Sequence, residues 1–241
     1  MSQNVVNPYM VTSDACTYRS GTEFTDWTLS GAYAIVSDAL VADMPVGDTY
    51  NGDHGYYDIG TANISATAWI LRWKWNITGA THSGGGVALV QCGLFSDNES
   101  AGTSGSYDGS YSSTQKVASI FTSITAAGKE YFQACTGSAS NNAYSVVTRS
   151  DLSDDFAYPA SYFFQVKRFD DSGTDTLQYG FTTNSDFSSL TTVDVTNATY
   201  MPSDLRYLKV ESLQPFSDTS NGLTTTIENM TFNNDTDVAC S

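Results

Sequence analysis

A stretch of alternating side chains, AWILRWKWNI at 68–77, constrains the fold of this chain more than any other feature. In an extended strand its three tryptophans lie on one side, and the charged Arg72 and Lys74 lie on the other. A period of two is typical of a β-strand with one buried face and one face toward solvent. We therefore expect the tryptophans to lie in a hydrophobic core rather than to form an exposed platform for sugars.

The rest of the chain has the composition and the turn pattern of an all-β protein. Thr, Val and aromatic residues favour strands, whereas only five Glu, five Lys and five Arg are available to cover helices. Clusters of Gly, Asn, Asp and Ser separate the apolar runs, and only 184–204 leaves room for a helical turn. We predict a two-layer antiparallel β-sandwich (jelly roll) over 25–235, with an N-terminal arm (1–24) and a C-terminal tail (236–241). Besides 68–77, strands are expected near 32–37, 87–95, 117–124, 129–135, 143–148, 160–169, 175–182, 205–213 and 223–232.

The charge balance excludes some partners. The chain has 26 acidic and 10 basic side chains among 241 residues, which gives a formal charge of −16. Binding to nucleic acid or to an anionic membrane surface needs a basic face, so neither partner is expected. No apolar run approaches the roughly 18 residues of a membrane span, so we do not expect membrane insertion.

Signals for the cellular compartment conflict. The first residues have neither the basic start nor the apolar core of a signal peptide. Six N-x-S/T sites nevertheless occur, and a surface rich in Tyr, Thr, Ser and Asn suggests an extracellular or virion location. The candidate glycosylation sites are Asn63, Asn76, Asn98, Asn197, Asn229 and Asn234.

Four cysteines allow three pairings, and none of them lies in a C-x-x-C spacing. Buried free thiols and disulfides are about equally expected from the sequence. If the cysteines are oxidised, we expect Cys16 to pair with Cys240 near the termini, and Cys92 to pair with Cys135 inside that loop.

The order of the predicted strands resembles the strand order of a known family. The segments AYAIVSDAL, TAWILRWKWNIT, GLFSDN, YFFQVKRFDDSGTDTLQYGF and DLRYLKVESLQPFSDTSNGLTTTIENMTF follow one another along the chain. This order is similar to the concanavalin A-like, laminin G-type jelly roll of many microbial and viral surface proteins. The closing "LRYLKV" strand, polar loop and "GLTTTIENMTF" strand carry the likeness best. The resemblance implies a surface module that binds glycans or proteins.

The superfamily that this chain resembles also includes β-glucanases, so a glycoside hydrolase is an alternative function. Glycoside hydrolysis needs two carboxyl groups flanking the scissile bond, and β-glucanases carry paired Glu on one strand. Here no Glu has a second Glu within six residues, and Glu228 is the best single candidate. His54 and His82 lie in Gly-rich stretches that read as turns, without a G-x-S-x-G or H-E-x-x-H motif. We expect no enzymatic activity.

The resemblance also implies a calcium ion at a rim loop in some members. Asp170, Asp171 and Asp175 surround a Ser-Gly turn and offer three carboxylates, which are ligands that calcium prefers. The acidic run 151–155 is a second candidate. An ordinary hairpin turn explains Asp and Gly at 170–175 equally well, because both are favoured there without any metal.

Sugar binding needs exposed aromatic rings with polar neighbours. One candidate cluster is Tyr107, Asp108 and Tyr111 in the long loop at 97–115, and a second contains Tyr56 and Tyr57. Two functions stay open. The first is a non-catalytic adhesion module for a glycan or a surface protein on a cell or virion. The second is a structural subunit of a capsid, filament or lattice that self-assembles.

Overall fold

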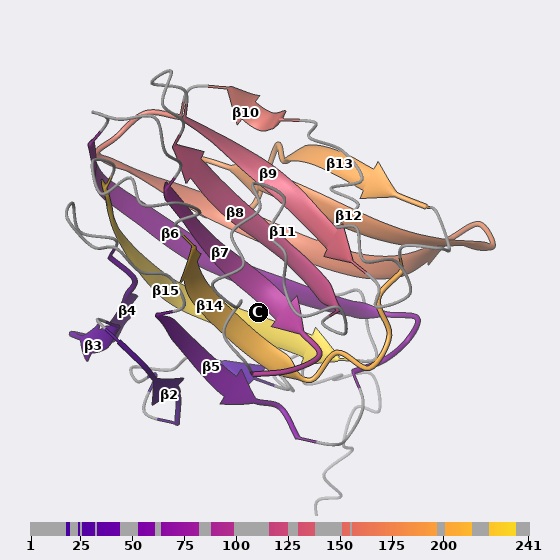
Figure 1. Cartoon of the computed structure of the whole chain (residues 1–241). Helices are drawn as coiled ribbons and strands as arrows, with labels where there is room; N and C mark the ends of the chain where they lie inside the picture. Colours follow the sequence, from indigo (N-terminus) through magenta and orange to yellow (C-terminus); the bar gives the residue numbers. More distant parts are fainter. Residues whose placement is uncertain are drawn as a thin grey trace, which may run out of the picture.

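Two antiparallel sheets face each other in the computed structural model and form a β-sandwich, as the sequence predicts (Figure 1). All the regular elements in the described part of the chain are strands, so none of them is a helix able to cross a membrane. The structure describes residues 18–19, 24, 26–31, 33–43, 53–60, 64–81, 88–98, 116–124, 130–137, 151–154, 156–196, 201–213 and 222–234.

The eight-stranded sheet has the long strands β6 and β15 at its centre, which pair antiparallel. Strand β1 (Tyr18–Arg19) pairs with β15 beside this path. The order across the sheet is β13 (Thr191–Val195), β12 (Thr174–Thr182), β11 (Ala160–Asp171), β6 (Trp69–Thr81), β15 (Gly222–Asn234), β4 (Ala39–Val41) and β3 (Ala34–Val36).

The seven-stranded sheet is also built from strands that are not consecutive along the chain. Its strand β14 lies between β7 and β5, so the late part of the sequence joins two early strands. The order is β10 (Asp151–Asp154), β9 (Glu130–Gly137), β8 (Val117–Ile124), β7 (Ala88–Phe95), β14 (Tyr207–Leu213), β5 (His54–Asp58) and β2 (Thr28–Leu29).

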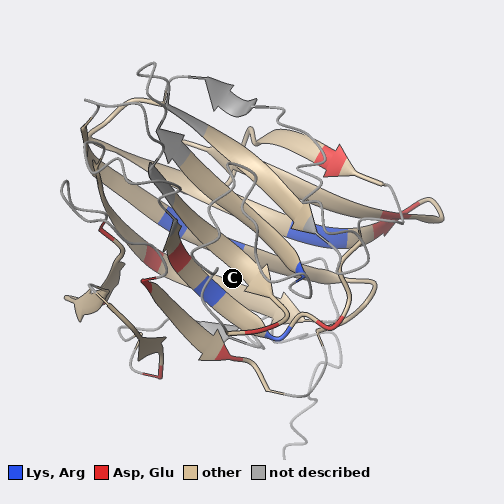
Figure 2. Ribbon diagram, viewed as in Figure 1, with Lys and Arg blue, Asp and Glu red and all other residues tan. Residues whose placement is uncertain are grey.

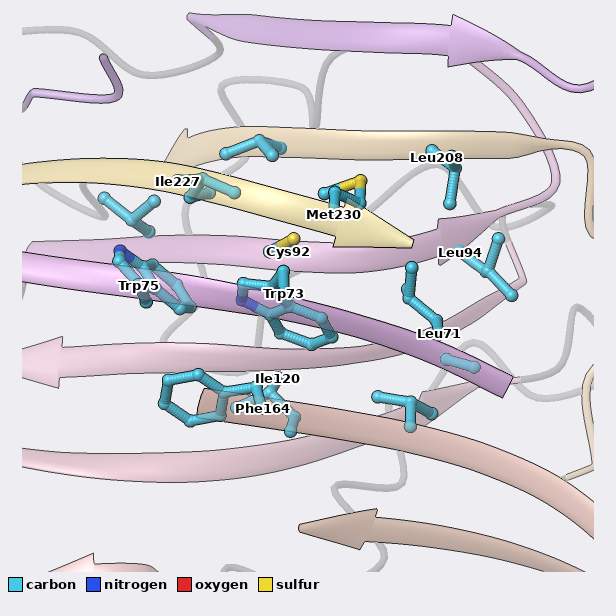
Figure 3. Close-up of a cluster of buried hydrophobic side chains, with 14 of the residues drawn as sticks. Leu71, Trp73, Trp75, Cys92, Leu94, Ile120, Phe164, Leu208, Ile227 and Met230 are labelled. Carbon is cyan, nitrogen blue, oxygen red and sulfur yellow. The ribbon is translucent and has the colours of Figure 1, made fainter. Parts of the chain in front are cut away.

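The core lies between the two sheets and confirms the predicted alternation of β6. Trp69, Trp73 and Trp75 have no exposed surface, whereas Arg72 and Lys74 on the other face are half-buried. The ring of Phe164, from β11, stacks on Trp73 and meets Trp75 edge-on, each at 5.5 Å between centroids (Figure 3). The tryptophan stripe is therefore structural, as expected.

Several strand assignments differ from the prediction, and no strand was expected at β2, β4 or β10, the last of which lies in the acidic run 151–155. Strand β1 and the fully buried Phe24 lie inside the segment predicted as an N-terminal arm, so the sandwich includes residues before 25. The region expected to hold a helical turn contains the edge strand β13, which pairs with β12. His54 begins strand β5 and does not lie in a turn. The expected strand at 143–148 lies outside the described residues.

The predicted disulfide between Cys92 and Cys135 is wrong, because both residues are buried free thiols. Cys92 is paired in register with Ile120 and packs in the core, whereas Cys135 is paired with Ser119 on the opposite face of the same sheet. Strand β8 separates the two cysteines, and strands lie about 4.8 Å apart, so their sulfur atoms cannot meet. Burial raises the pKa of the Cys135 thiol to about 12. Cys16 and Cys240 lie outside the described residues, so their pairing stays a prediction.

Candidate functional site

Segments from both sheets meet at one end of the sandwich, where β5, β7 and β11 finish and β6, β8 and β14 begin. We call it the loop end. Tyr207 at the start of β14 is paired in register with Asp58 and with Phe95, which end β5 and β7. The backbone N–H of Arg206 donates to the carbonyl of Phe95 at 2.8 Å. The loop end therefore gathers residues that are distant in the sequence.

The long segment with three predicted ligand residues is attached at this end. The backbone N–H of Ser96 donates to the carbonyl of Lys116 at 2.9 Å, and the Lys116 N–H donates to Ser96 Oγ at 2.8 Å. These two bonds join the two ends of the segment that carries Tyr107, Asp108 and Tyr111. The three residues themselves lie outside the described residues, so their role stays a prediction.

The structure separates the second predicted aromatic cluster. Tyr57 packs against the core, whereas Tyr56 lies on the outer face of the seven-stranded sheet and is half-buried. The ring of Tyr56 stacks on His54 at 6.0 Å and meets Tyr207 edge-on at 5.6 Å. A hydrogen bond of 2.9 Å joins His54 Nδ1 to Ser30 Oγ. The two rings therefore lie on opposite faces of the sheet and do not form one cluster, and their role in ligand binding stays a prediction.

Two ion pairs that the sequence did not reveal line the loop end. Arg206 donates to both carboxylate oxygens of Asp58, at 2.8 and 2.6 Å, and Lys116 Nζ donates to Asp204 at 2.6 Å. Ser203 Oγ also donates to Asp204, at 3.1 Å. The Arg206 bonds hold the pKa of Asp58 below its usual range, and the Lys116 bond does the same for the pKa of Asp204. Both carboxylates are therefore ionised acceptors at neutral pH.

A pocket of about 250 Å³ opens beside these pairs, between the segment before β6 and the segment before β14. The guanidinium of Arg168, only 8% exposed, lines it and is fixed by two bonds to Asp175 and one to the carbonyl of Pro202. Ser203 and Asp204 supply the outer polar wall. The volume lies below the roughly 300–1,000 Å³ of drug-sized pockets, so one small polar unit would fit.

The three carboxylates of the candidate calcium loop, Asp170, Asp171 and Asp175, do not form one cluster in the structure. In the described part of the chain, no three His, Cys, Asp or Glu side chains lie where they could hold a metal ion. Asp175 is bound by Arg168, and Asp170 accepts the backbone N–H of Gly173 at 2.7 Å. Asp171 is paired in register with Thr174 across an ordinary hairpin turn. The ion pair and the turn account for the positions of Asp175 and Asp170, and calcium binding by this loop stays a prediction.

A buried ion pair on the outer face of the seven-stranded sheet is a further feature that the sequence did not reveal. Lys209 Nζ lies 2.7 Å from Glu211 Oε2, and both side chains have no exposed surface. Adjacent blue and red segments of β14 mark the pair in Figure 2. Lys209 is paired in register with Gly93, and its Nζ lies 4.8 Å from the centre of the Phe95 ring. The outer face of β14 is therefore buried at these two positions.

The chemistry available at the loop end is recognition by hydrogen bonds and ring contact. Asp58 and Asp204 each have a cationic partner and a lowered pKa, so neither suits a general acid that must be protonated near neutral pH. Glu228, the best single candidate for a catalytic acid, lies on β15 and pairs with Lys74 at 2.9 Å. It is on the outer face of the other sheet.

The two-sheet β-sandwich of this chain is similar to the folds of several solved lectins and carbohydrate recognition domains. No protein-family model and no curated protein matches the sequence. Among solved structures, the CBM2 module of the evolved Dit of Lactobacillus casei BL23 phage J-1 is similar, with a TM-score of 0.57 and 13% identity, covering 90% of this chain and 94% of that one.

Two further similar structures are lectin-type domains. The carbohydrate recognition domain of Emp46p, in its metal-free form, has a TM-score of 0.54 and 11% identity, covering 90% of this chain and 96% of that one. Lectin II from Ulex europaeus has a TM-score of 0.51 and 11% identity, covering 87% and 92%. At these identities the likeness establishes the sandwich fold and leaves the ligand to be inferred from the site.

Proposed function

We propose that this chain is a non-catalytic glycan-binding module whose ligand site is at the loop end. The single observation that carries the proposal is the pocket beside Ser203 and Asp204, which combines hydroxyl, carboxylate and guanidinium groups in a lectin-type sandwich. A sugar ring presents many hydroxyl groups and one apolar face. Such a ligand is well served by fixed polar groups with an aromatic ring, here Tyr56, at the same end.

The charges of the site favour a neutral glycan. Lys116 and Arg168, the cations closest to the pocket, are each paired with an aspartate. The chain as a whole carries a formal charge of −16, which repels polyanions. We infer adhesion to neutral glycans on the outside of a cell or virion. The similarity of the fold to carbohydrate recognition domains supports this role.

A glycan microarray with neutral and acidic glycans tests the proposal, followed by calorimetry with the strongest binder. The informative variant is Asp204→Asn, because asparagine tolerates the positive φ of 58° at this position while removing the charge that organises Lys116 and Ser203. We expect at least a fivefold loss of affinity. The matched control is Asp186→Asn, since Asp186 is also an exposed aspartate that accepts a hydrogen bond from a nearby serine.

Two results would count against the proposal. One is a wild-type protein that binds no glycan on the array, and the other is an equal effect of the two aspartate variants. Repeating the assay with EDTA tests whether glycan binding depends on calcium, because a module that depends on a cation loses binding when the cation is chelated.

A further inference from the structure

Polar side chains from three strands form a connected network on the outer face of the eight-stranded sheet. Asn76 on β6 is paired in register with Ser161 on β11 and with Thr226 on β15. Ser161 Oγ donates to Asn76 Oδ1 at 2.5 Å, and Asn76 Nδ2 donates to Thr226 Oγ1 at 3.1 Å and to Glu228 Oε1. Lys74 Nζ donates to Glu228 Oε2 at 2.9 Å. These side chains are therefore fixed before any ligand arrives.

A shallow depression of about 440 Å³ lies over this network. Its polar walls come from Asn76, Thr78, Ser161, Thr226 and Glu228, and Pro159 forms an apolar wall. The residue before this proline, Tyr158, is 37% exposed. Large apolar side chains with that much exposure are rare in the described part of the chain, where Val36 is the other example. An exposed aromatic residue therefore adjoins, along the chain, the proline that lines the depression.

Irregular pairing gives the depression its shape. The register between β15 and β6 shifts between Thr224 and Thr225, which leaves Thr78 unpaired and exposed at the rim. It shifts again after Glu228, where Asn229 has a φ of 50°. Bulges of this kind redirect side chains and are over-represented next to functional sites. Here they flank the part of β15 that carries Thr226 and Glu228.

We propose that this depression is a second saccharide site, selective for neutral sugars. Glu228 is the one carboxylate among the described residues that line it, and Lys74 compensates its charge. An exposed tyrosine, two or more hydroxyls, an amide and a compensated carboxylate suit a ligand that has many hydroxyls and no charge. The site goes beyond the function proposed for the loop end and uses different residues.

The two sites lie at different places along the same strands. Arg168, which lines the loop-end pocket, is paired with Trp69, whereas Ser161 is paired with Asn76. Seven residues of strand separate these pairs, which is about 23 Å at the usual rise per residue. Because seven is an odd number, the side chains of Arg168 and Ser161 point to opposite faces of the sheet, so the two sites should bind their ligands independently.

The test is a titration of the 15N-labelled full chain with glucose, galactose, mannose and N-acetylglucosamine, followed by 1H–15N NMR. We expect shifts of the backbone amides at 160–161 and 226–228 with at least one of these sugars. Tyr158→Ala should weaken that binding about tenfold, because it removes the ring and leaves the network intact. Val36→Ala is the control, since it truncates the other exposed large apolar side chain in the described part of the chain, far from the depression in sequence.

Failure of this proposal is distinguishable from failure of the loop-end site. Asp204→Asn should leave the shifts at 226–228 unchanged, because Asp204 contributes nothing to the depression. Absence of these shifts with all four sugars would overturn the second site, as would unaltered binding by Tyr158→Ala. Loss of the same shifts in Asp204→Asn would show that there is one site and not two.

Discussion

The buried pair of Lys209 and Glu211 gives a sharp test of the energetics of this sandwich. Both side chains have no exposed surface, so Lys209→Met leaves a carboxylate in a dry environment without its cation. Breaking such a pair costs about 3–5 kcal/mol, a large part of the roughly 5–15 kcal/mol that stabilises a typical domain. The double variant Lys209→Met/Glu211→Leu removes both charges, and we expect its stability to be near that of the wild type or above it.

The assay is unfolding in guanidinium chloride, followed by the fluorescence of the buried tryptophans. With the denaturant sensitivity usual for domains, the single variant should lower the midpoint by roughly 1 M. Lys74→Met is the matched control, because the Lys74–Glu228 pair has the same chemistry but is 25% and 30% exposed. Exposed pairs contribute about 1 kcal/mol or less. Equal effects of Lys209→Met and Lys74→Met would refute the reasoning.

Three further predictions concern titration, thiol reactivity and modification. Arg206→Gln should raise the pKa of Asp58 toward its ordinary value, and 13C NMR can measure this pKa. Because the pKa of Asp58 is lowered in the folded state, the stabilisation by this ion pair is present at neutral pH. It is lost in acid as Asp58 gains its proton. An unchanged pKa would contradict the assignment. Burial raises the pKa of Cys135 to about 12, so this thiol should resist iodoacetamide at pH 8 in the folded protein and react once the protein is unfolded. Mass spectrometry measures the labelling. Labelling of Cys135 in the folded protein would argue against its burial. When the protein is expressed in a glycosylating host, glycopeptide mapping should find a glycan on Asn229, because this residue is exposed. Asn76 should be unmodified, because its side-chain amide is hydrogen-bonded within the sheet. A glycan on Asn76 would refute this prediction.

The central strands could be predicted from the sequence because burial and alternation coincide in them. Strand β6 has a core face and a polar face along most of its length, so its period of two is visible without any tertiary information. Strands β5 and β13 lack this signal. The edge strand β13 is mostly exposed, and HGYYD in β5 is flanked by Gly and Asp, so local chemistry favoured turns in both regions.

The candidate site was less predictable, since tertiary pairing creates it. Asp58 and Arg206 are distant in the sequence and meet because β14 lies between β5 and β7. Arg168 and Asp175 were visible as charges, but only the register of β11 and β12 shows that they bind each other. The burial of Lys209 and Glu211 could not be predicted, because alternation indicates which residues share a face and does not indicate what covers that face.

The positions of β14 and β15 also determine how this chain must fold. Each is a late strand inserted in the interior of its sheet: β14 joins β7 to β5, and β15 joins β6 to β4. Before residues 207–234 leave the ribosome, each sheet consists of two parts with open edges. Closing these gaps requires contacts between distant parts of the chain, which slows folding and exposes unpaired strands in the meantime. The nascent chain is therefore most vulnerable to aggregation just before its last two strands arrive.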